Sequence, residues 1–199
     1  MLLTYNFSTL AQRVRAHLGQ DHRYAHVVRV ARCAETLAMR HGLNARKARL
    51  AGMLHDLARL YSGPRLIDEC ELRRIPIGTF ERANPIVLHA PLGAALAQEA
   101  FAVHDPEVLS AIAKHTVAAP EMSPLDCVLY LADGLEPGRE YAERADLWAL
   151  ACRDLPAAMR ATLSSTLAHL ARKKIPVAPQ TLAAAGTFHI ERGGLPSLT

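Results

Sequence analysis

The stretch LAGMLHDLAR, residues 50–59, places His55 and Asp56 in the middle of an apolar helical segment. Its Leu and Ala residues would face a core, where an unpaired carboxylate is costly to bury. Adjacent residues on a helix point about 100° apart, so His55 alone cannot satisfy Asp56. A metal ion between helices would bind both the carboxylate oxygen and the imidazole nitrogen. The stretch therefore predicts a buried helix that contributes to a metal site.

Two other apolar segments contain candidate ligands of the same kind. His26 lies in YAHVVRVA, residues 24–31, and Asp133 ends CVLYLAD, residues 127–133. Asp133 could also be an ordinary helix C-terminal residue, and a single helical histidine is more often structural. Three apolar helices that each carry an inward ligand are nevertheless typical of metal sites in helical bundles.

The composition favours an all-α fold with a single domain. Half of the 199 residues are hydrophobic, Ala and Leu dominate, and only 5% are aromatic, whereas strands favour aromatic and β-branched residues. Helical periodicity with cap and stop signals divides the chain into segments. We expect helices at about residues 8–19, 21–41, 45–61, 85 or 89–101, 105–115, 123–136, 143–171 and 180–185, with one short helix and a loop in 64–85. Pro156 is a candidate break in the longest of these helices.

Cysteine usage and charge indicate the compartment and the class of partner. The four cysteines are far apart and include no CxxC pair, so we expect reduced thiols in a cytoplasmic protein. The first 19 residues do not have the pattern of a secretory signal, and no apolar run approaches the roughly 20 residues that span a bilayer. The net charge of +4 is mild. It suits an anionic small molecule, and we expect neither a nucleic-acid nor a membrane partner.

The order H…HD…D, formed by His26, His55-Asp56 and Asp133, resembles the HD superfamily of metal-dependent phosphohydrolases. Further segments resemble, in order, the YqeK family, which contains HD-type symmetrical diadenosine tetraphosphate hydrolases. After residues 50–59, these segments are LHAPLGAALA (88–97), VLSAIAKHT (108–116), MSPLDCVLYLADGLEPGR (122–139) and IPVAPQTLAAA (175–185). The resemblance implies a single HD domain over residues 1–199. Its HD core covers about 20–140, its C-terminal helices about 143–185, and a frayed tail 186–199.

The resemblance also implies residue roles. The metal ligands would be His26, His55, Asp56 and Asp133. Catalytic roles would fall to Asp56, Arg59, His89 and His115, and substrate would contact Arg59, His89, His115, Thr116, Asp133 and Arg139. The family typically binds iron. The ligand types also suit Mn, Co or Zn, and a second metal at His89 and His115 stays open.

Two positions depart from the family's usual pattern. Arg59 stands where the family often has Lys; either cation binds phosphate, but Arg can do so through a bidentate fork. Gly186 stands where the family usually has Asn, which affects the contacts expected on the nucleotide side.

The implied reaction is symmetrical cleavage of diadenosine tetraphosphate to two ADP by a metal-activated water. The enzyme would be a bis(5'-nucleosyl)-tetraphosphatase (symmetrical), with a dinucleoside polyphosphate or ADP as its partner. Two alternatives stay open: another HD nucleotide phosphohydrolase acting on a mononucleotide or dNTP, and a metal-containing nucleotide sensor with little turnover. A homodimer also stays open.

Overall fold

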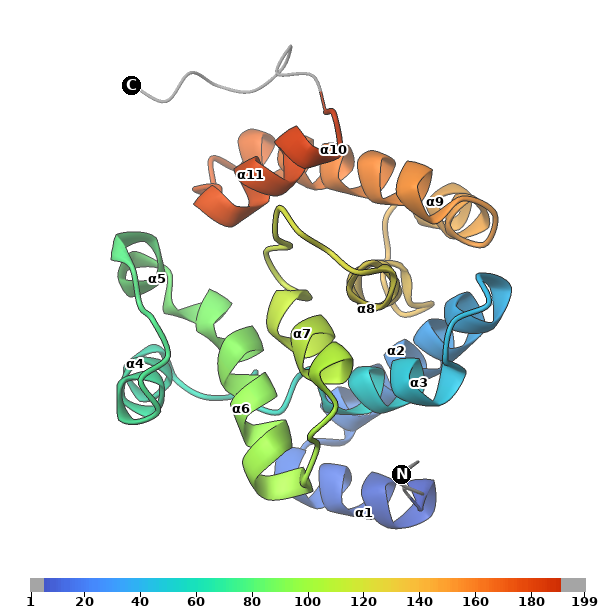
Figure 1. Ribbon diagram of the computed structural model, residues 1–199. Coiled ribbons are helices and arrows are strands. Elements are labelled where there is room, and N and C mark those ends of the chain that lie inside the picture. Colours follow the sequence, from blue (N-terminus) through green and yellow to red (C-terminus); the bar gives the residue numbers. More distant parts are fainter. Residues whose placement is uncertain (1–5, 191–199) are drawn as a thin grey trace.

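The computed structural model describes residues 6–190, and every regular element within that range is helical (Figure 1). The expectation of an all-α fold is confirmed. The elements are α1 (Phe7–Leu18), α2 (Asp21–Arg40), α3 (Ala45–Leu54), α4 (Gly63–Leu72), α5 (Thr79–Ala83), the 3-10 helix η1 (Pro85–Leu88), α6 (His89–Phe101), α7 (Pro106–Lys114), α8 (Pro124–Leu135), α9 (Arg144–Ala151), α10 (Leu155–Lys173) and α11 (Pro179–Thr187).

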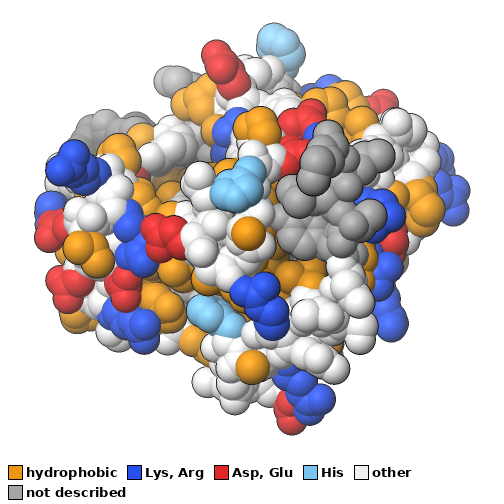
Figure 2. Space-filling view, turned by 60° about the horizontal axis from the view of Figure 1, so that its bottom comes forward, with side chains coloured by type: hydrophobic (Ala, Val, Ile, Leu, Met, Phe, Trp, Pro, Cys, Tyr) orange, Lys and Arg blue, Asp and Glu red, His pale blue; other side chains and the backbone are white. Residues whose placement is uncertain are grey.

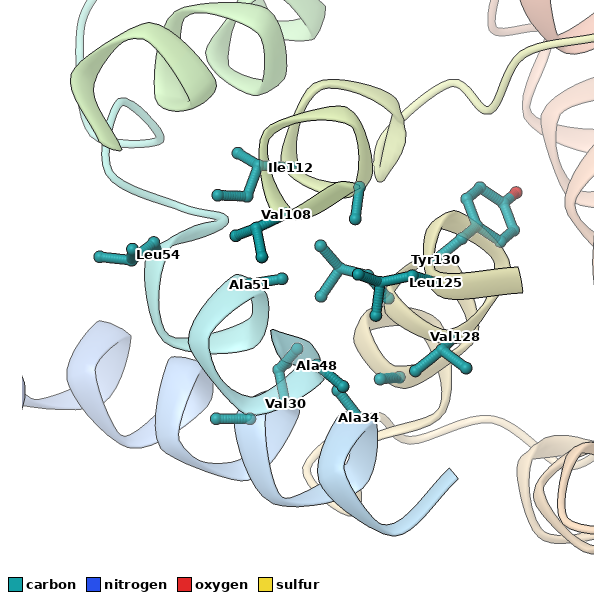
Figure 3. Packing of buried hydrophobic residues seen from close by; sticks show 14 of the residues in the cluster. Val30, Ala34, Ala48, Ala51, Leu54, Val108, Ile112, Leu125, Val128 and Tyr130 are labelled. Carbon is teal, nitrogen blue, oxygen red and sulfur yellow. The ribbon is translucent and has the colours of Figure 1, made fainter. Parts of the chain in front are cut away.

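Helix α8 lies near the middle of the molecule, with α7 on one side and the α2–α3 pair on another (Figure 1). Side chains from these four helices interlock in a common core (Figure 3). Its buried members include Val30 and Ala34 from α2, Ala48, Ala51 and Leu54 from α3, Val108 and Ile112 from α7, and Leu125 and Val128 from α8. Because such a core is close-packed, it holds any side chain that these helices direct to one point in a fixed position.

Small residues bring α2 and α3 unusually close together. A Cβ added to Gly52 would lie 2.6 Å from the Cα of Ala31, so only glycine allows this approach. Gly93 of α6 plays a similar part, because a Cβ there would lie 3.1 Å from the carbonyl oxygen of His55. The backbone around His55 is therefore enclosed by α2 on one side and by α6 on another.

The predicted helix at 45–61 is too long, because α3 ends at Leu54 and residues 55–60 form a series of turns. In these turns the backbone N–H bonds the carbonyl three residues earlier, as in Arg59 N to Asp56 O at 3.0 Å. The imidazole Nδ1 of His55 donates to the carbonyl of Gly52 at 2.8 Å. The His55 side chain thus competes for a carbonyl that would otherwise accept a backbone N–H in a continuing α-helix, and the helix ends before His55 and Asp56.

Two other boundaries differ from expectation, each for a capping reason. Residues 64–85 form two α-helices and a 3-10 helix rather than one helix, since Ser62 caps α4 and Glu81 bonds the Gly78 N–H at the start of α5. The segment 143–171 is divided into α9 and α10, since Asp154 caps Ala157 N at 2.9 Å and Pro156 lies in the first turn of α10.

The C-terminal helices form a layer beside α8, with α9 and α10 both packed on it (Figure 1). Helix α11 is attached by Thr181, whose hydroxyl donates to the carbonyl of Val117 at 2.7 Å. It continues to Thr187, so Gly186 belongs to a helix and not to the expected tail. The rest of that tail, from residue 191, lies outside the described residues.

The cysteines, the length of the helices and the surface charges can be examined in the described residues. All four cysteines are free, and three of them are buried. None of the helices between residues 6 and 190 has the length and apolarity to cross a bilayer. On the face shown in Figure 2, acidic and basic side chains are interspersed rather than gathered into a patch of one sign.

Candidate metal centre

The candidate ligands lie close together at the meeting point of five parts of the chain: α2, the turn after α3, the start of α6, the end of α7, and α8. They are His26 of α2, His55 and Asp56 after α3, His89 at the start of α6, His115 just after α7, and Asp133 of α8. All are buried except Asp133, whose side chain is 20% exposed. Residues up to 107 positions apart in the sequence thus form one cluster around the core described above.

Three of the histidines have the same local geometry, which fixes the orientation of their rings. His55, His89 and His115 each direct Nδ1 at the backbone carbonyl three residues earlier, at 2.8, 2.5 and 2.7 Å. Because a carbonyl oxygen only accepts, each Nδ1 carries the hydrogen. In the neutral ring, each Nε2 therefore presents a lone pair toward the others.

The Nε2 atoms face one another and the two carboxylates. The Nε2 atoms of His89 and His115 are 3.2 Å apart, and that of His55 is buried without a hydrogen-bond partner. His26 Nε2 lies 3.2 Å from Asp133 Oδ1 and 3.7 Å from Asp56 Oδ2. On its other side, Asp56 Oδ1 is 3.5 Å from His89 Nε2 and 3.6 Å from His55 Nε2. Asp56 is thus positioned between two sets of imidazoles.

Burial keeps the histidines on the α6 and α7 side neutral. It lowers the pKa of His115 to about 3, with repulsion from His55 and His89 adding to the effect. Burial also lowers the pKa of His89. For Asp56, burial favours the neutral acid, yet the surrounding imidazoles outweigh this and lower its pKa. Burial opposes the charged form of His26 as well, but hydrogen bonds and charge from Asp133 and Glu136 outweigh it and raise the pKa of His26. Neutral His89 and His115 beside an ionised Asp56 are the protonation states that bind metals.

These residues fit a divalent cation. Neutral Nε2 atoms at 3.2 Å that both act as acceptors repel each other unless a positive group lies between them. Three sets of three ligand atoms lie within 4.8 Å of one another: His26, His55 and Asp56; His55, His115 and Asp133; and Asp56, His89 and His115. The donor set of imidazole and carboxylate, with no thiolate, suits Fe, Mn, Co or Zn.

A cavity of about 350 Å³ opens beside the cluster and contains the expected substrate side. It is lined by Arg23, Asp56, Arg59, Ile86, His89, Thr116, Asp133 and Arg139. Arg139 Nη2 bonds Asp133 Oδ1 at 2.5 Å, and its Nε donates to the carbonyl of Asp133. The hydroxyl of Thr116 lies 3.1 Å from Nε2 of both His89 and His115. The carboxylates of this His and Asp cluster suit a cation, and the guanidinium groups around the opening suit an anion that approaches it.

Sequence reasoning missed two residues of this region. Arg23 lies three residues before His26, so it shares that face of α2, and its Nη1 is 3.7 Å from Asp56 Oδ2. Glu136, three residues after Asp133, bonds His26 Nδ1 at 3.1 Å. The spacing of three from a predicted ligand was a signal in both cases.

Gly186 of α11 was expected to affect the contacts on the nucleotide side. Among the described residues, those that line the cavity include none from α11, so this effect stays a prediction.

A larger cavity of about 430 Å³ lies elsewhere, between α7 and the start of α8. It is lined in part by Lys114 and Asp126, which form an ion pair of 2.9 Å. Asp126 also accepts the N–H of Ser123 in a capping box. Oδ2 of Asp126 makes these contacts as a helix cap, whereas its Oδ1 is buried without a hydrogen-bond partner. None of the residues that line this cavity is a histidine.

The model of the HD domain family matches residues 23–138, more than half of the chain and the span that contains the whole cluster. The protein therefore belongs to the HD domain family. It is similar to the symmetrical bis(5'-nucleosyl)-tetraphosphatase of Bacillus subtilis, with 35% identity over 161 residues that cover 81% of this chain and 86% of that protein. The protein of the same name from Halalkalibacterium halodurans is 33% identical over 186 residues, covering 91% of this chain and 96% of the relative.

A crystal structure from Clostridium acetobutylicum has the same fold. It is described as a predicted HD superfamily hydrolase involved in NAD metabolism. The TM-score is 0.88 with 30% identity, over 93% of this chain and 97% of the other. The match extends beyond the HD segment, so it includes most of the C-terminal layer. The expected resemblance to HD-type tetraphosphatases is confirmed.

Proposed function

We propose that this protein is a metal-dependent hydrolase that cleaves diadenosine tetraphosphate symmetrically into two molecules of ADP. The observation that carries the proposal is the convergence of imidazole Nε2 atoms and two carboxylates beside a cavity bordered by arginines. Similarity over most of the chain to two proteins named symmetrical tetraphosphatases supports this particular substrate.

His26, His55, Asp56 and Asp133 would hold one divalent ion, and Asp56, His89 and His115 suit a second. Iron is our proposal for its identity, and the ligand set also accommodates Mn, Co or Zn. When bound, such an ion supplies Lewis acidity toward a phosphoryl oxygen and lowers the pKa of water. The distances between the ligand atoms support a shared role for Asp56, because its two oxygens face different sets of imidazoles.

The arginines at the cavity would bind and orient the polyphosphate. A guanidinium can contact two phosphoryl oxygens at once, and Arg59 and Arg139 line the same cavity. Thr116 adds a hydroxyl donor beside them. The charge that accumulates on phosphoryl oxygens during phosphoryl transfer is stabilised by such preorganised donors. Arg139 also pairs with Asp133, so it links the substrate side to a proposed metal ligand.

The test is product identification with diadenosine tetraphosphate in water enriched in oxygen-18, after loading with Fe, Mn, Co or Zn. We expect ADP as the sole nucleotide product, with one labelled oxygen on the β-phosphate of one of the two ADP molecules. ATP plus AMP would indicate asymmetrical cleavage. No bound transition metal and no ADP with any of the four metals would refute the proposal.

Two alternatives use the same site. The first is another HD nucleotide phosphohydrolase that acts on a mononucleotide or dNTP, which would release inorganic phosphate or other products in place of two ADP. A substrate panel with product identification separates these reactions. Tight ADP binding with no turnover of any dinucleotide would instead favour a sensor. A homodimer, a cytoplasmic location and the single-domain organisation stay predictions beside this proposal.

A further inference from the structure

Glu136 is a buried carboxylate next to the proposed metal centre, and the reaction outlined above does not use it. It follows α8 directly and is 1% exposed. It accepts hydrogen bonds from His26 Nδ1 at 3.1 Å, from Arg29 Nε at 2.5 Å and Nη2 at 3.0 Å, and from the N–H of Gly138 at 2.5 Å. Both carboxylate oxygens are therefore committed to donors from α2 and from the chain just after α8.

His26 differs from the other histidines of the cluster in how its ring is held. His55, His89 and His115 donate Nδ1–H to a backbone carbonyl three residues earlier. His26 lies within the regular helix α2, and its Nδ1 bonds the Glu136 side chain instead. An ionised carboxylate only accepts, so Nδ1 carries the hydrogen and Nε2 is left to face Asp56 and Asp133.

We propose that Glu136 is a positioning residue that fixes the tautomer and the orientation of His26 for metal binding. This inference rests on the proposed metal site. A carboxylate that accepts the second N–H of a metal-binding imidazole raises the basicity of that ligand and fixes its direction. At the three other histidines the acceptor of the Nδ1 hydrogen is a backbone carbonyl, which no substitution removes. Only at His26 is the acceptor a side chain, so only there can mutation test its effect.

The surrounding residues hold Glu136 itself in place. Arg29 contacts both of its oxygens, and the guanidinium covers Gly138 so closely that an added Cβ would lie 2.5 Å from Arg29 Nη2. The next residue, Arg139, bonds Asp133. The short segment 136–139 thus contacts two proposed ligands that lie on different helices, α2 and α8.

Glu136→Gln tests the proposal, with Arg29→Met as the matched control. The glutamine amide has one acceptor oxygen for three donor groups, so either His26 loses its acceptor or an amide N–H faces Nδ1. We expect Co²⁺ binding to weaken about 10- to 100-fold, with a changed visible spectrum of bound Co²⁺. At saturating metal, kcat for diadenosine tetraphosphate should fall while KM stays close to wild type. Arg29→Met removes one of the groups that hold Glu136 but leaves its hydrogen bonds from His26 and Gly138, so Co²⁺ affinity should fall clearly less than in Glu136→Gln.

Two outcomes would overturn the inference. One is a wild-type Co²⁺ affinity in Glu136→Gln. The other is a loss of Co²⁺ affinity in Arg29→Met as large as in Glu136→Gln, which would indicate that the ion pair only stabilises the fold and has no specific effect on His26. If Glu136→Gln does not fold by circular dichroism, the double variant Arg29→Met/Glu136→Gln removes the charged pair together and is measured in the same way. A wild-type protein that binds no metal would refute the proposed function first, which separates the two failures.

Discussion

Asp56 is the residue whose two oxygens face different sides of the cluster, with His26 on one side and His89 on the other. Like His55 and His115, it belongs to two of the three candidate ligand groups. Its carboxylate is 5% exposed, with Arg23 as the nearest cation at 3.7 Å. A buried carboxylate of this kind is costly unless a cation compensates it. At the scale of the single residue, Asp56 is therefore the position that most directly tests the metal site.

Asp56→Ala should abolish binding of both ions, whereas His89→Ala should remove only the second. The far-UV circular dichroism of Asp56→Ala should remain helical, because replacing a buried charge does not by itself disturb the apolar core. Metal content per chain by elemental analysis, after loading with Fe or Mn, measures both expectations. Wild-type metal content and activity in Asp56→Ala would contradict the site.

The ligands that could be predicted from sequence are those in apolar surroundings. His26, His55, Asp56 and Asp133 are polar residues among Leu, Val and Ala, and such residues need a buried partner. Arg23 and Glu136 lacked this apolar setting, so their only signal was the spacing of three residues from a predicted ligand, and a charged residue at such a position is usually solvated. Glu136 reaches His26 only because α8 ends beside α2, and no local pattern specifies that contact.

At the scale of elements, the close approach of α2 and α3 positions two of the ligands. Gly52→Ala would place a methyl group 2.6 Å from Ala31 Cα, so the helices must separate. We expect a loss of stability of about 1–3 kcal/mol, as for other overpacked cores. Weaker metal binding should accompany it, since His26 and His55 lie on the two elements that move apart. Urea unfolding and Co²⁺ titration measure the two effects.

Gly134 of α8 offers a matched control for that substitution. It is also helical and lies next to a proposed ligand, Asp133, but nothing lies within 4 Å of an added Cβ. Gly134→Ala should be neutral or stabilise by up to about 1 kcal/mol through helix propensity. Equal destabilisation of Gly52→Ala and Gly134→Ala would show that the close contact between α2 and α3 at Gly52 is not the cause of the lost stability.

The start of α7 provides a prediction with a defined pH dependence. Asp105 caps the N–H groups of Glu107 and Val108 and lies 2.8 Å from Lys47 Nζ. Burial opposes ionisation, but the Lys47 hydrogen bond and the backbone N–H groups together lower the pKa of Asp105. A lowered folded-state pKa adds stability above the unfolded value of about 4, and this stability is lost as the pH falls through the folded value.

Asp105→Ala should therefore destabilise the protein by about 1 kcal/mol at pH 7, the usual value of a helix cap. The difference from wild type should shrink as the pH falls through the folded-state pKa. Asp105→Asn keeps a good cap without the charge. It should therefore lose less stability at pH 7 than Asp105→Ala, and its stability should depend less on pH in the acid range than that of the wild type. Urea midpoints from pH 7 downward measure this; a difference that grows toward acid would contradict the sign.

Helix starts were easier to predict than helix ends. Asn44, Asp105 and Ser123 are side-chain caps directly before α3, α7 and α8, and a cap is a local signal. The end of α3 could not be predicted in this way, because the imidazole of His55 bonds the Gly52 carbonyl while its ring lies in the cluster of His and Asp side chains. Tertiary contacts thus shorten that helix where its sequence alone favours continuation.

At the scale of the whole molecule, the periodicity predicts the helices but not their mutual arrangement. The order of motifs indicated that residues from α2 to α8 form one site, and the fold brings them together as expected. The position of α9–α11 beside α8 had no sequence signal, since those helices contain none of the proposed ligands. Because α9 and α10 pack on α8, we expect this layer and the HD segment to unfold together.

Metal removal tests whether the two parts unfold together. The single tryptophan of the chain, Trp148, lies on α9, outside the segment matched by the HD model, so its fluorescence reports on the C-terminal layer. An ion that binds only the folded state stabilises it by about 4.1 kcal/mol at a free concentration of about 1,000 Kd. For a chain of this length that corresponds to a Tm increase of roughly 8–16 °C. Since α8 packs against both α2 and α10, we expect Trp148 fluorescence and far-UV circular dichroism to shift together when metal is added, and to fall back together with a chelator. A Trp148 transition that ignores the metal while the circular dichroism moves would mean that α9–α11 unfold as a separate unit, and the single-domain prediction would then be wrong.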